Sequence, residues 1–406
     1  MTDSVESAGW YHLRMARPLI ETRPTVAHPS KMMLERFPVT ILLGSQLAAM
    51  IVIPAIMKGT QPLGLIVGIC AVAVAVALFV ELLSQPLVLP QRAPRPISTR
   101  ATATVLIVGA VAVVASALGG RGTYAVQLGL AQESPIVSIA GPFTVWVVFG
   151  TALVFWRFRR GEVSRKAALW VLVGVSALFL WEGLTRAILG QSAALILTLL
   201  VLAVFARLIR LRTIVITLLL IPIVWPPLYD LRDAFRRATV EGAVGISANA
   251  PLERLQLDTQ MAYIERLTPR PDGFEALDLP TLIRIGLIPG FLDPNRPAVD
   301  TGSRMSLALG GSASNSQSAT MLGNVFVFDG WLGVCVFAVV LTLAMGFLTR
   351  RDNPWALAAV GLVYWSAISF NATYPDVVPR VLQALVSMVI AYVVVRMLTP
   401  PRLAGP

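Results

Sequence analysis

Arginine side chains gather in one polar stretch of this chain, between residues 230 and 330. The stretch contains nine arginines, twelve acidic residues and no lysine. Its arginines are Arg232, Arg236, Arg237, Arg254, Arg266, Arg270, Arg284, Arg296 and Arg304. A guanidinium makes planar, bidentate contacts with phosphate and keeps its charge near a low-dielectric surface. This use of arginine alone favours a phosphate-bearing ligand, with a solvated surface of salt bridges as the alternative.

Arg186 lies apart from that stretch, between two apolar runs that are each long enough to enter a membrane. An ionisable residue at membrane depth is costly, so it usually has a partner or a function. Glu182 stands four residues earlier and would share one face of a continuous helix with Arg186. Two interpretations stay open, a structural ion pair between Glu182 and Arg186 or a phosphate site at Arg186.

Carboxylates are the acid–base groups that this chain offers to such a site. Glu253 and Asp258 flank Arg254, and a carboxylate base beside a phosphate-binding arginine could promote attack by a sugar hydroxyl. The same spacing also occurs on an ordinary helix surface. Glu253, Arg254 and Asp258 are therefore candidate catalytic residues together with Arg186.

Histidine is scarce, and this scarcity excludes several chemistries. The only two histidines, His12 and His28, lie near the N-terminus. The polar stretch therefore has no histidine for a Ser-His or Cys-His nucleophile and no His/Cys cluster for zinc. We predict neither a metal site nor a cofactor.

Composition places these residues on a membrane protein. The chain has 406 residues, of which 56% are hydrophobic and only 14% are charged, and its mean hydropathy is +0.73. Ten apolar runs could span a bilayer, at about 38–57, 62–83, 102–118, 137–156, 167–184, 187–206, 213–229, 331–349, 354–371 and 380–397. The predicted fold is an all-α polytopic membrane protein with about ten transmembrane helices and one long, largely helical extracytoplasmic loop.

Basic residues orient these runs. With the N-terminus in the cytoplasm, most lysines and arginines fall on cytoplasmic loops, as the positive-inside rule requires. The short outer loops keep only Lys58, Arg121, Arg186 and Arg380. The same bias explains the net charge of +11 without a nucleic-acid partner. The predicted parts are a cytoplasmic tail (1–37), helices 1–7 (38–229), an extracytoplasmic loop domain (230–330), helices 8–10 (331–397) and a cytoplasmic C-terminal tail (398–406).

Four segments in this order resemble bacterial polysaccharide repeat-unit polymerases of the Wzy type. They are Gly183-Leu-Thr-Arg186 before an apolar run, Pro251–Asp258, Leu287–Pro297 and Ser318–Val334 at the entry to the next run. The many spans and the single long loop late in the chain match this family's layout. The related O-antigen ligases share the layout but use an outer-loop histidine, which this chain lacks.

The resemblance implies a metal-independent, inverting glycosyltransferase in the cytoplasmic (inner) membrane, with both termini in the cytoplasm. Its donor would be a glycan on undecaprenyl pyrophosphate, and its acceptor a second lipid-linked repeat unit. Arg186 and Arg254 would hold the pyrophosphate, and Glu253 or Asp258 would be the base. Further candidates for substrate binding are Arg304, Arg284, Arg296, Arg380 and Glu182.

The expected partners are the lipid-linked oligosaccharide and the bilayer, with a chain-length regulator and a flippase as further candidates. Two alternatives remain, an O-antigen ligase-like transferase and a transporter or flippase of polysaccharide precursors. A transporter needs polar residues along its midplane, whereas these runs are nearly free of charge. We expect the loop to fold back on the bundle and to enclose a cavity between Arg186 and Arg254.

Overall fold

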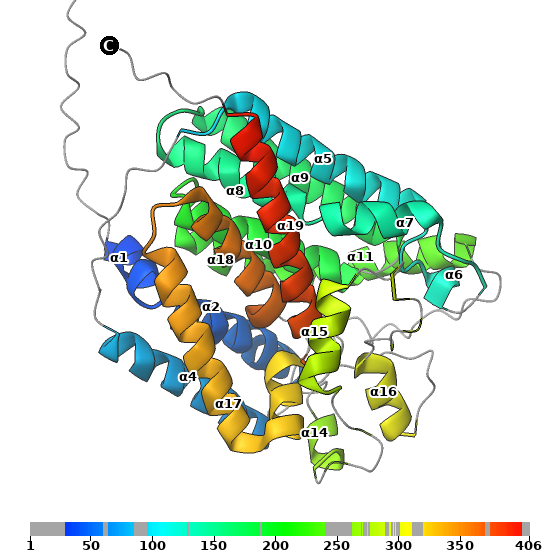
Figure 1. Cartoon of the computed structure of the whole chain (residues 1–406). Coiled ribbons are helices and arrows are strands. Elements are labelled where there is room, and N and C mark those ends of the chain that lie inside the picture. The colour runs from blue at the N-terminus through cyan, green and yellow to red at the C-terminus, as the bar shows by residue number, and fades with distance from the viewer. Residues whose placement is uncertain are drawn as a thin grey trace, which may run out of the picture.

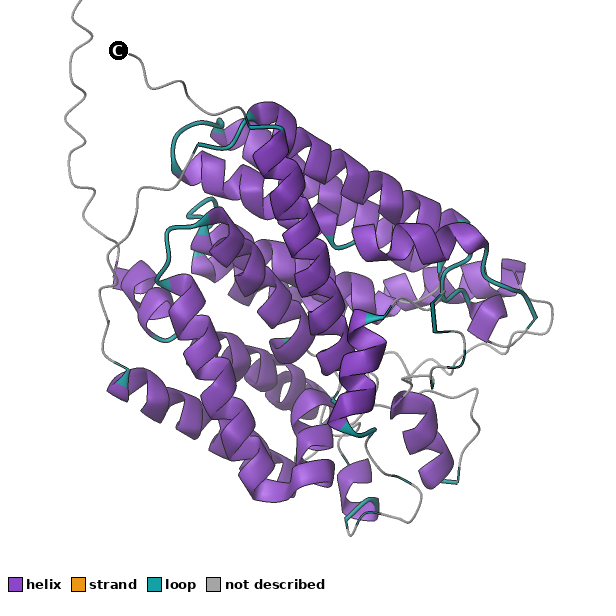
Figure 2. Cartoon of the chain, viewed as in Figure 1, coloured by secondary structure: helices purple, strands orange, loops and turns teal. Residues whose placement is uncertain are grey.

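The chain folds into a bundle of helices (Figure 1). The structure is a computed structural model that describes residues 29–59, 64–84, 96–127, 130–186, 189–239, 262–268, 270, 274, 277–288, 292–293, 295, 297, 301–310, 320–369 and 374–399. Within these residues every regular element is a helix and no strand occurs, as Figure 2 shows.

Eight helical segments of the described chain are long and apolar enough to cross a membrane. They are Pro38–Ile56, α4 (Gly64–Leu83), α5 (Thr99–Leu118), Pro135–Arg159, α9 (Arg165–Thr185), α11 (Leu211–Thr239), α17 (Thr320–Thr349) and α19 (Val377–Met397). Two shorter apolar helices, α10 (Leu189–Phe205) and Pro354–Ile368, lie at the two remaining predicted runs. The predicted fold class is confirmed, because the chain is an all-α, multi-pass membrane protein suited to a lipid bilayer.

Three of these segments are composite. Their parts are α2 (Pro38–Leu47), the π-helix η1 (Ala48–Val52) and α3 (Ile53–Lys58); α7 (Pro135–Ala140), the 3-10 helix η2 (Gly141–Phe143) and α8 (Trp146–Arg159); and α18 (Pro354–Val363) with the π-helix η3 (Tyr364–Ile368).

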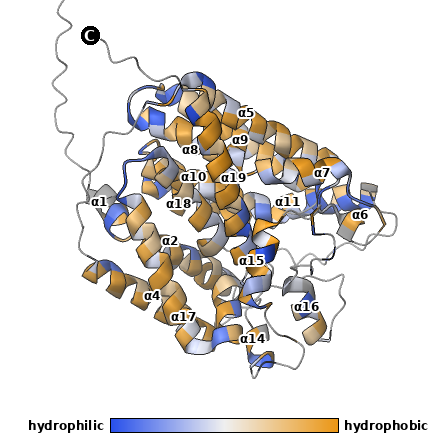
Figure 3. Cartoon of the chain, in the orientation of Figure 1, coloured by the Kyte–Doolittle hydropathy of each residue, from blue (hydrophilic) through white to orange (hydrophobic). Residues whose placement is uncertain are grey.

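Short helices lie at the ends of the bundle. They are α1 (Pro29–Arg36), α6 (Tyr124–Gln127), α14 (Tyr263–Arg266), α15 (Leu279–Leu287) and α16 (Thr301–Ala308). In Figure 1, α14, α15 and α16 lie at the end of the bundle opposite α1. Figure 3 shows hydrophobic residues along the long helices, with hydrophilic residues mainly at the helix ends and on the short helices.

Local sequence sets where several helices begin and end. Ser98 precedes α5, and its hydroxyl accepts a hydrogen bond from the Ala101 amide at 3.0 Å, which satisfies a donor that the helix leaves unbonded. Gly330 breaks α17 into residues 320–329 and 331–349, because its φ of 63° and ψ of −158° are not helical. α11 continues to Thr239, beyond the predicted apolar run 213–229, since the leucine, alanine and arginine residues that follow favour helix.

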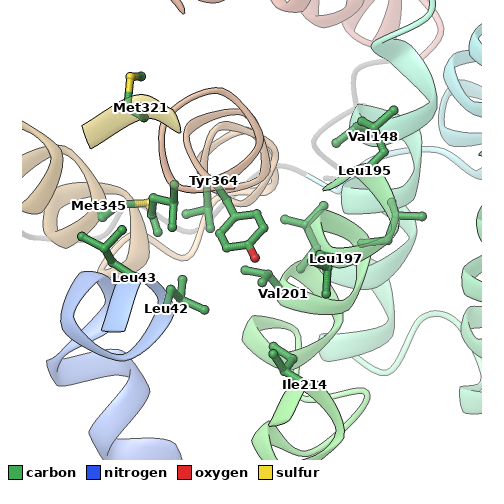
Figure 4. Packing of buried hydrophobic residues seen from close by; sticks show 14 of the residues in the cluster. Leu42, Leu43, Val148, Leu195, Leu197, Val201, Ile214, Met321, Met345 and Tyr364 are labelled. Atoms are coloured by element: carbon green, nitrogen blue, oxygen red, sulfur yellow. The ribbon is translucent and has the colours of Figure 1, made fainter. Parts of the chain in front are cut away.

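Buried polar groups in the core form hydrogen bonds with one another. Tyr364 is fully buried and lies near Leu42 and Val201 (Figure 4). Its hydroxyl donates to Gln46 Oε1 at 3.0 Å, and Gln46 Nε2 donates to the carbonyl of Ile368 at 2.8 Å. Ile368 ends a π-helical turn, so the glutamine bonds a carbonyl at the end of the helix.

α5 and α8 come into backbone contact at glycine. A Cβ atom on Gly109 would lie 2.2 Å from the amide nitrogen of Val147, and one on Gly150 would lie 2.6 Å from Leu106 Cα. Small residues allow this close approach between membrane helices. The contact fixes the position of α5, whose far end carries part of the site described below.

Replacing Gly109 with alanine should lower the thermal unfolding midpoint of the detergent-solubilised protein. The added methyl group would push α5 and α8 apart, and overpacking of this kind costs about 1–3 kcal/mol. Gly174→Ala is the matched control, because a Cβ on that α9 glycine would meet nothing within 4 Å. Equal midpoints for the two variants would contradict this close contact.

Candidate functional site

Three arginines from distant parts of the chain come together at one end of the bundle. Arg121 lies in the loop between α5 and α6, Arg186 caps the C-terminus of α9, and Arg380 lies in the first turn of α19. Burial lowers the pKa of Arg121, and the positive charges of Arg186 and Arg380 are near enough to lower it further. We call Arg121, Arg186 and Arg380 the arginine cluster.

The loop that carries Arg121 is glycine-rich and tightly tied. Gly120 and Gly122 have φ values of 80° and 57°, a region that side-chain-bearing residues rarely adopt. The amide of Gly122 donates to Glu133 Oε1 at 2.7 Å, and the Ser134 amide donates to the Gly119 carbonyl at 2.9 Å. These bonds hold the backbone on both sides of Arg121, so they fix the position from which its side chain extends.

Arg186 forms the ion pair that its spacing allows. Its Nη1 donates to Glu182 Oε1 at 2.7 Å, and the two side chains are only 9% and 7% exposed. Burial of this pair is costly unless the charges satisfy each other, which this geometry does. The predicted ion pair between Glu182 and Arg186 is therefore present. It uses only the Nη1 atom of the guanidinium.

One nitrogen of the Arg186 guanidinium is left without a bond to the described part of the chain. Its Nε atom is buried and has no hydrogen-bond partner among the residues that the structure describes. A Cβ atom on Gly122 would lie 3.0 Å from Nη2 and 3.9 Å from Nε of Arg186. The glycine therefore lets the loop backbone pack closely against the Nε–Nη2 edge, where a side chain would crowd the guanidinium.

Charges of both signs surround Arg121. Burial and the positive charge of Arg186 lower the pKa of Arg121, with Arg380 acting in the same direction, while Glu182 and Glu133 raise it. Its Nη1 donates to Thr144 Oγ1 at 3.3 Å. An arginine stays protonated in proteins, so the carboxylates of Glu182 and Glu133 offset the repulsion between these guanidiniums.

Arg380 connects the cluster to the long polar stretch. It lies 3.8 Å from Asp376 (Nη2 to Oδ2), and the hydroxyl of Thr301 in α16 donates to Asp376 Oδ1 at 2.5 Å. α15 packs on α19 close enough that a Cβ on Gly286 would lie 3.0 Å from Pro379 Cα. The described part of the stretch is therefore anchored beside the arginine cluster.

The other predicted residues divide into two groups. Arg284 is paired with Asp293: its Nη2 donates to Oδ1 at 2.5 Å, and its Nε donates to Oδ2 at 2.8 Å. Arg304 is half-buried on α16. Glu253, Arg254, Asp258 and Arg296 lie outside the described residues. The predicted cavity between Arg186 and Arg254 therefore stays a prediction.

Sequence reasoning passed over Arg121. The signal was present, because Arg121 is one of only four basic residues on the predicted short outer loops. Its place beside Arg186 depends on the packing of α5 against α9, which spacing along the chain does not reveal. Among the described residues, no group of three or more His, Cys, Asp or Glu side chains could hold a metal ion.

Comparison with known proteins finds no family model, no curated protein and no solved structure that matches the chain.

Glu182→Gln should destabilise the protein strongly. The variant leaves the Arg186 charge buried without a counter-charge, and breaking a buried pair in this way costs about 3–5 kcal/mol. The thermal unfolding midpoint in detergent measures the effect. Glu35→Gln is the control, because Glu35 pairs with Arg207 at an exposed site, with side chains 47% and 42% exposed, and surface pairs contribute at most about 1 kcal/mol. Similar small shifts for both variants would contradict the role given to Glu182.

Proposed function

We propose that this protein polymerises undecaprenyl-pyrophosphate-linked oligosaccharide repeat units on the outer face of the cytoplasmic membrane, with both termini in the cytoplasm. The observation that carries the proposal is the arginine cluster, in which Arg186 packs against the glycine loop of Arg121 and its buried Nε has no partner among the described residues. Three guanidiniums at one end of an apolar bundle suit the pyrophosphate of a membrane-anchored donor. α15 and α16, two helices of the polar stretch, pack beside the cluster at the same end of the bundle.

The proposed reaction is a single inverting displacement. A hydroxyl oxygen of the acceptor sugar attacks the anomeric carbon of the donor, and the bond from that carbon to the pyrophosphate oxygen breaks. The pyrophosphate leaves with the bonding electrons, and the arginine cluster stabilises its growing charge. Glu253 or Asp258 takes the proton of the attacking hydroxyl.

We assign the role of base to Glu253 or Asp258, because the carboxylates described beside the arginine cluster already accept hydrogen bonds from other groups. Glu182 is bonded to Arg186, Glu133 accepts the Gly122 amide, and Asp376 accepts the Thr301 hydroxyl. These three acids set the position and charge of the arginines. The division of roles leaves Glu253 and Asp258 as the groups to test for proton transfer.

Alanine substitutions at Arg121, Arg186 and Arg254 should each abolish long glycan chains while a single-unit band remains. Loss of one donor to a leaving group typically slows a reaction about 10²–10³-fold. The measurement is a gel ladder of surface glycan from cells that depend on the variant, with expression confirmed in the membrane fraction. Arg266→Ala is the matched control, because Arg266 is an exposed arginine of α14.

The same gel separates the alternatives. Unchanged chain lengths in the Arg121 and Arg186 variants would exclude the polymerase. Long lipid-linked chains that are not transferred onward would indicate a ligase-like transferase instead. Accumulation of single units on the cytoplasmic side, in all three variants, would indicate a transporter or flippase of the precursors.

A further inference from the structure

An apolar groove lies on the surface of the bundle between α5 and α7. Its volume is about 570 Å³. The lining residues are Ala110, Val111, Val114, Ala115, Leu118, Gly119, Ser134 and Ile136. Val111, Leu118 and Ile136 are exposed, so the groove opens sideways to the hydrocarbon that surrounds a membrane bundle.

The groove ends at the glycine loop of the arginine cluster. A Cβ on Gly119 would lie 2.8 Å from Cγ2 of both Ile136 and Val137, so α5 and α7 pack together at this end. Arg121 follows Gly119 by two residues. The head of a chain lying in the groove would therefore reach the loop that carries Arg121.

The length of the groove suits a chain in one leaflet. From Ala110 to Gly119, α5 rises by roughly 14 Å at 1.5 Å per residue. The hydrocarbon layer is about 30 Å thick, so the groove spans about half of it. An apolar wall gains little against lipid tails, which are equally apolar. Selectivity must then come from the charged end, where Arg121 would hold an anionic headgroup.

A second apolar hollow lies between α9, α10 and α11 but does not open toward the cluster. Its volume is about 130 Å³, and α9 contributes Leu180 to its wall. Leu180 and Glu182 are two residues apart, which is about 200° around a helix. The hollow therefore lies on the face of α9 opposite the Glu182–Arg186 pair.

We infer that the groove between α5 and α7 binds the polyprenyl chain of a single-chain lipid pyrophosphate whose headgroup contacts Arg121. The choice of a polyprenyl chain rests on the proposed function. The position in the groove rests on its apolar lining, its length and the two-residue separation between Gly119, which lines its end, and Arg121. A two-chain anionic phospholipid is the competing occupant.

The test measures binding of undecaprenyl pyrophosphate to the full-length protein in nanodiscs. Ala115→Trp fills the groove one turn before Gly119 and so keeps the headgroup from the charged end, and we expect it to weaken binding at least tenfold. Ala75→Trp is the matched control on the exposed face of α4 and should leave binding unchanged. Arg121→Ala should weaken binding of the pyrophosphate but not the much weaker binding of undecaprenol, which has the same chain without the charge.

A second measurement uses the nearly native protein. Ile136 replaced by the photoreactive residue benzoylphenylalanine should crosslink to undecaprenyl pyrophosphate, and excess phosphatidylglycerol should not prevent it. Displacement by phosphatidylglycerol, absence of the crosslink, or equal binding by the Ala115→Trp and Ala75→Trp variants would each overturn the inference. Both measurements report lipid binding and do not depend on glycan synthesis. Lipid binding in the groove by a protein that makes no polymer would therefore refute the proposed function alone.

Discussion

A buried positive charge at the edge of an apolar bundle is the constraint on which the functional end of this protein depends. Arg186 can occupy that place because Glu182 lies one turn earlier on the same helix and neutralises it. Gly122 then allows the loop backbone to approach the remaining edge of the guanidinium closely. Glu133 holds the Gly122 amide, so this edge is bordered by backbone rather than by a movable side chain.

Close helix packing sets the geometry of the same end. Gly109 and Gly150 allow α5 to lie against α8, and α9 and α19 also pack on α5. This arrangement places three helix ends next to each other, each with one arginine. Asp376 and Thr301 extend the arrangement to α16, so part of the polar stretch is fixed to the bundle by a hydrogen bond rather than by apolar contact alone.

Hydropathy was sufficient to predict the fold class, because each apolar run must become a helix to satisfy its backbone in lipid. The Glu182–Arg186 pair was also predictable, since both residues lie on one helix and four-residue spacing determines their contact. The approach of Arg121 to Arg186 was not, because it depends on which helices are neighbours, and apolar runs of similar composition do not encode that. Gly330 shows the same limit, since its break in α17 is a backbone conformation that hydropathy does not report.

The pairing of Glu182 with Arg186 also bears on how the protein is made. Both partners belong to α9, so the helix carries its own counter-charge and can enter the bilayer as a nearly neutral unit. Arg380, in contrast, is synthesised much later than α9 and reaches its neighbours only when α19 is in place. Membrane insertion of α9 is thus separated in time from completion of the arginine cluster, because Arg380 joins Arg121 and Arg186 only when α19 packs on α5.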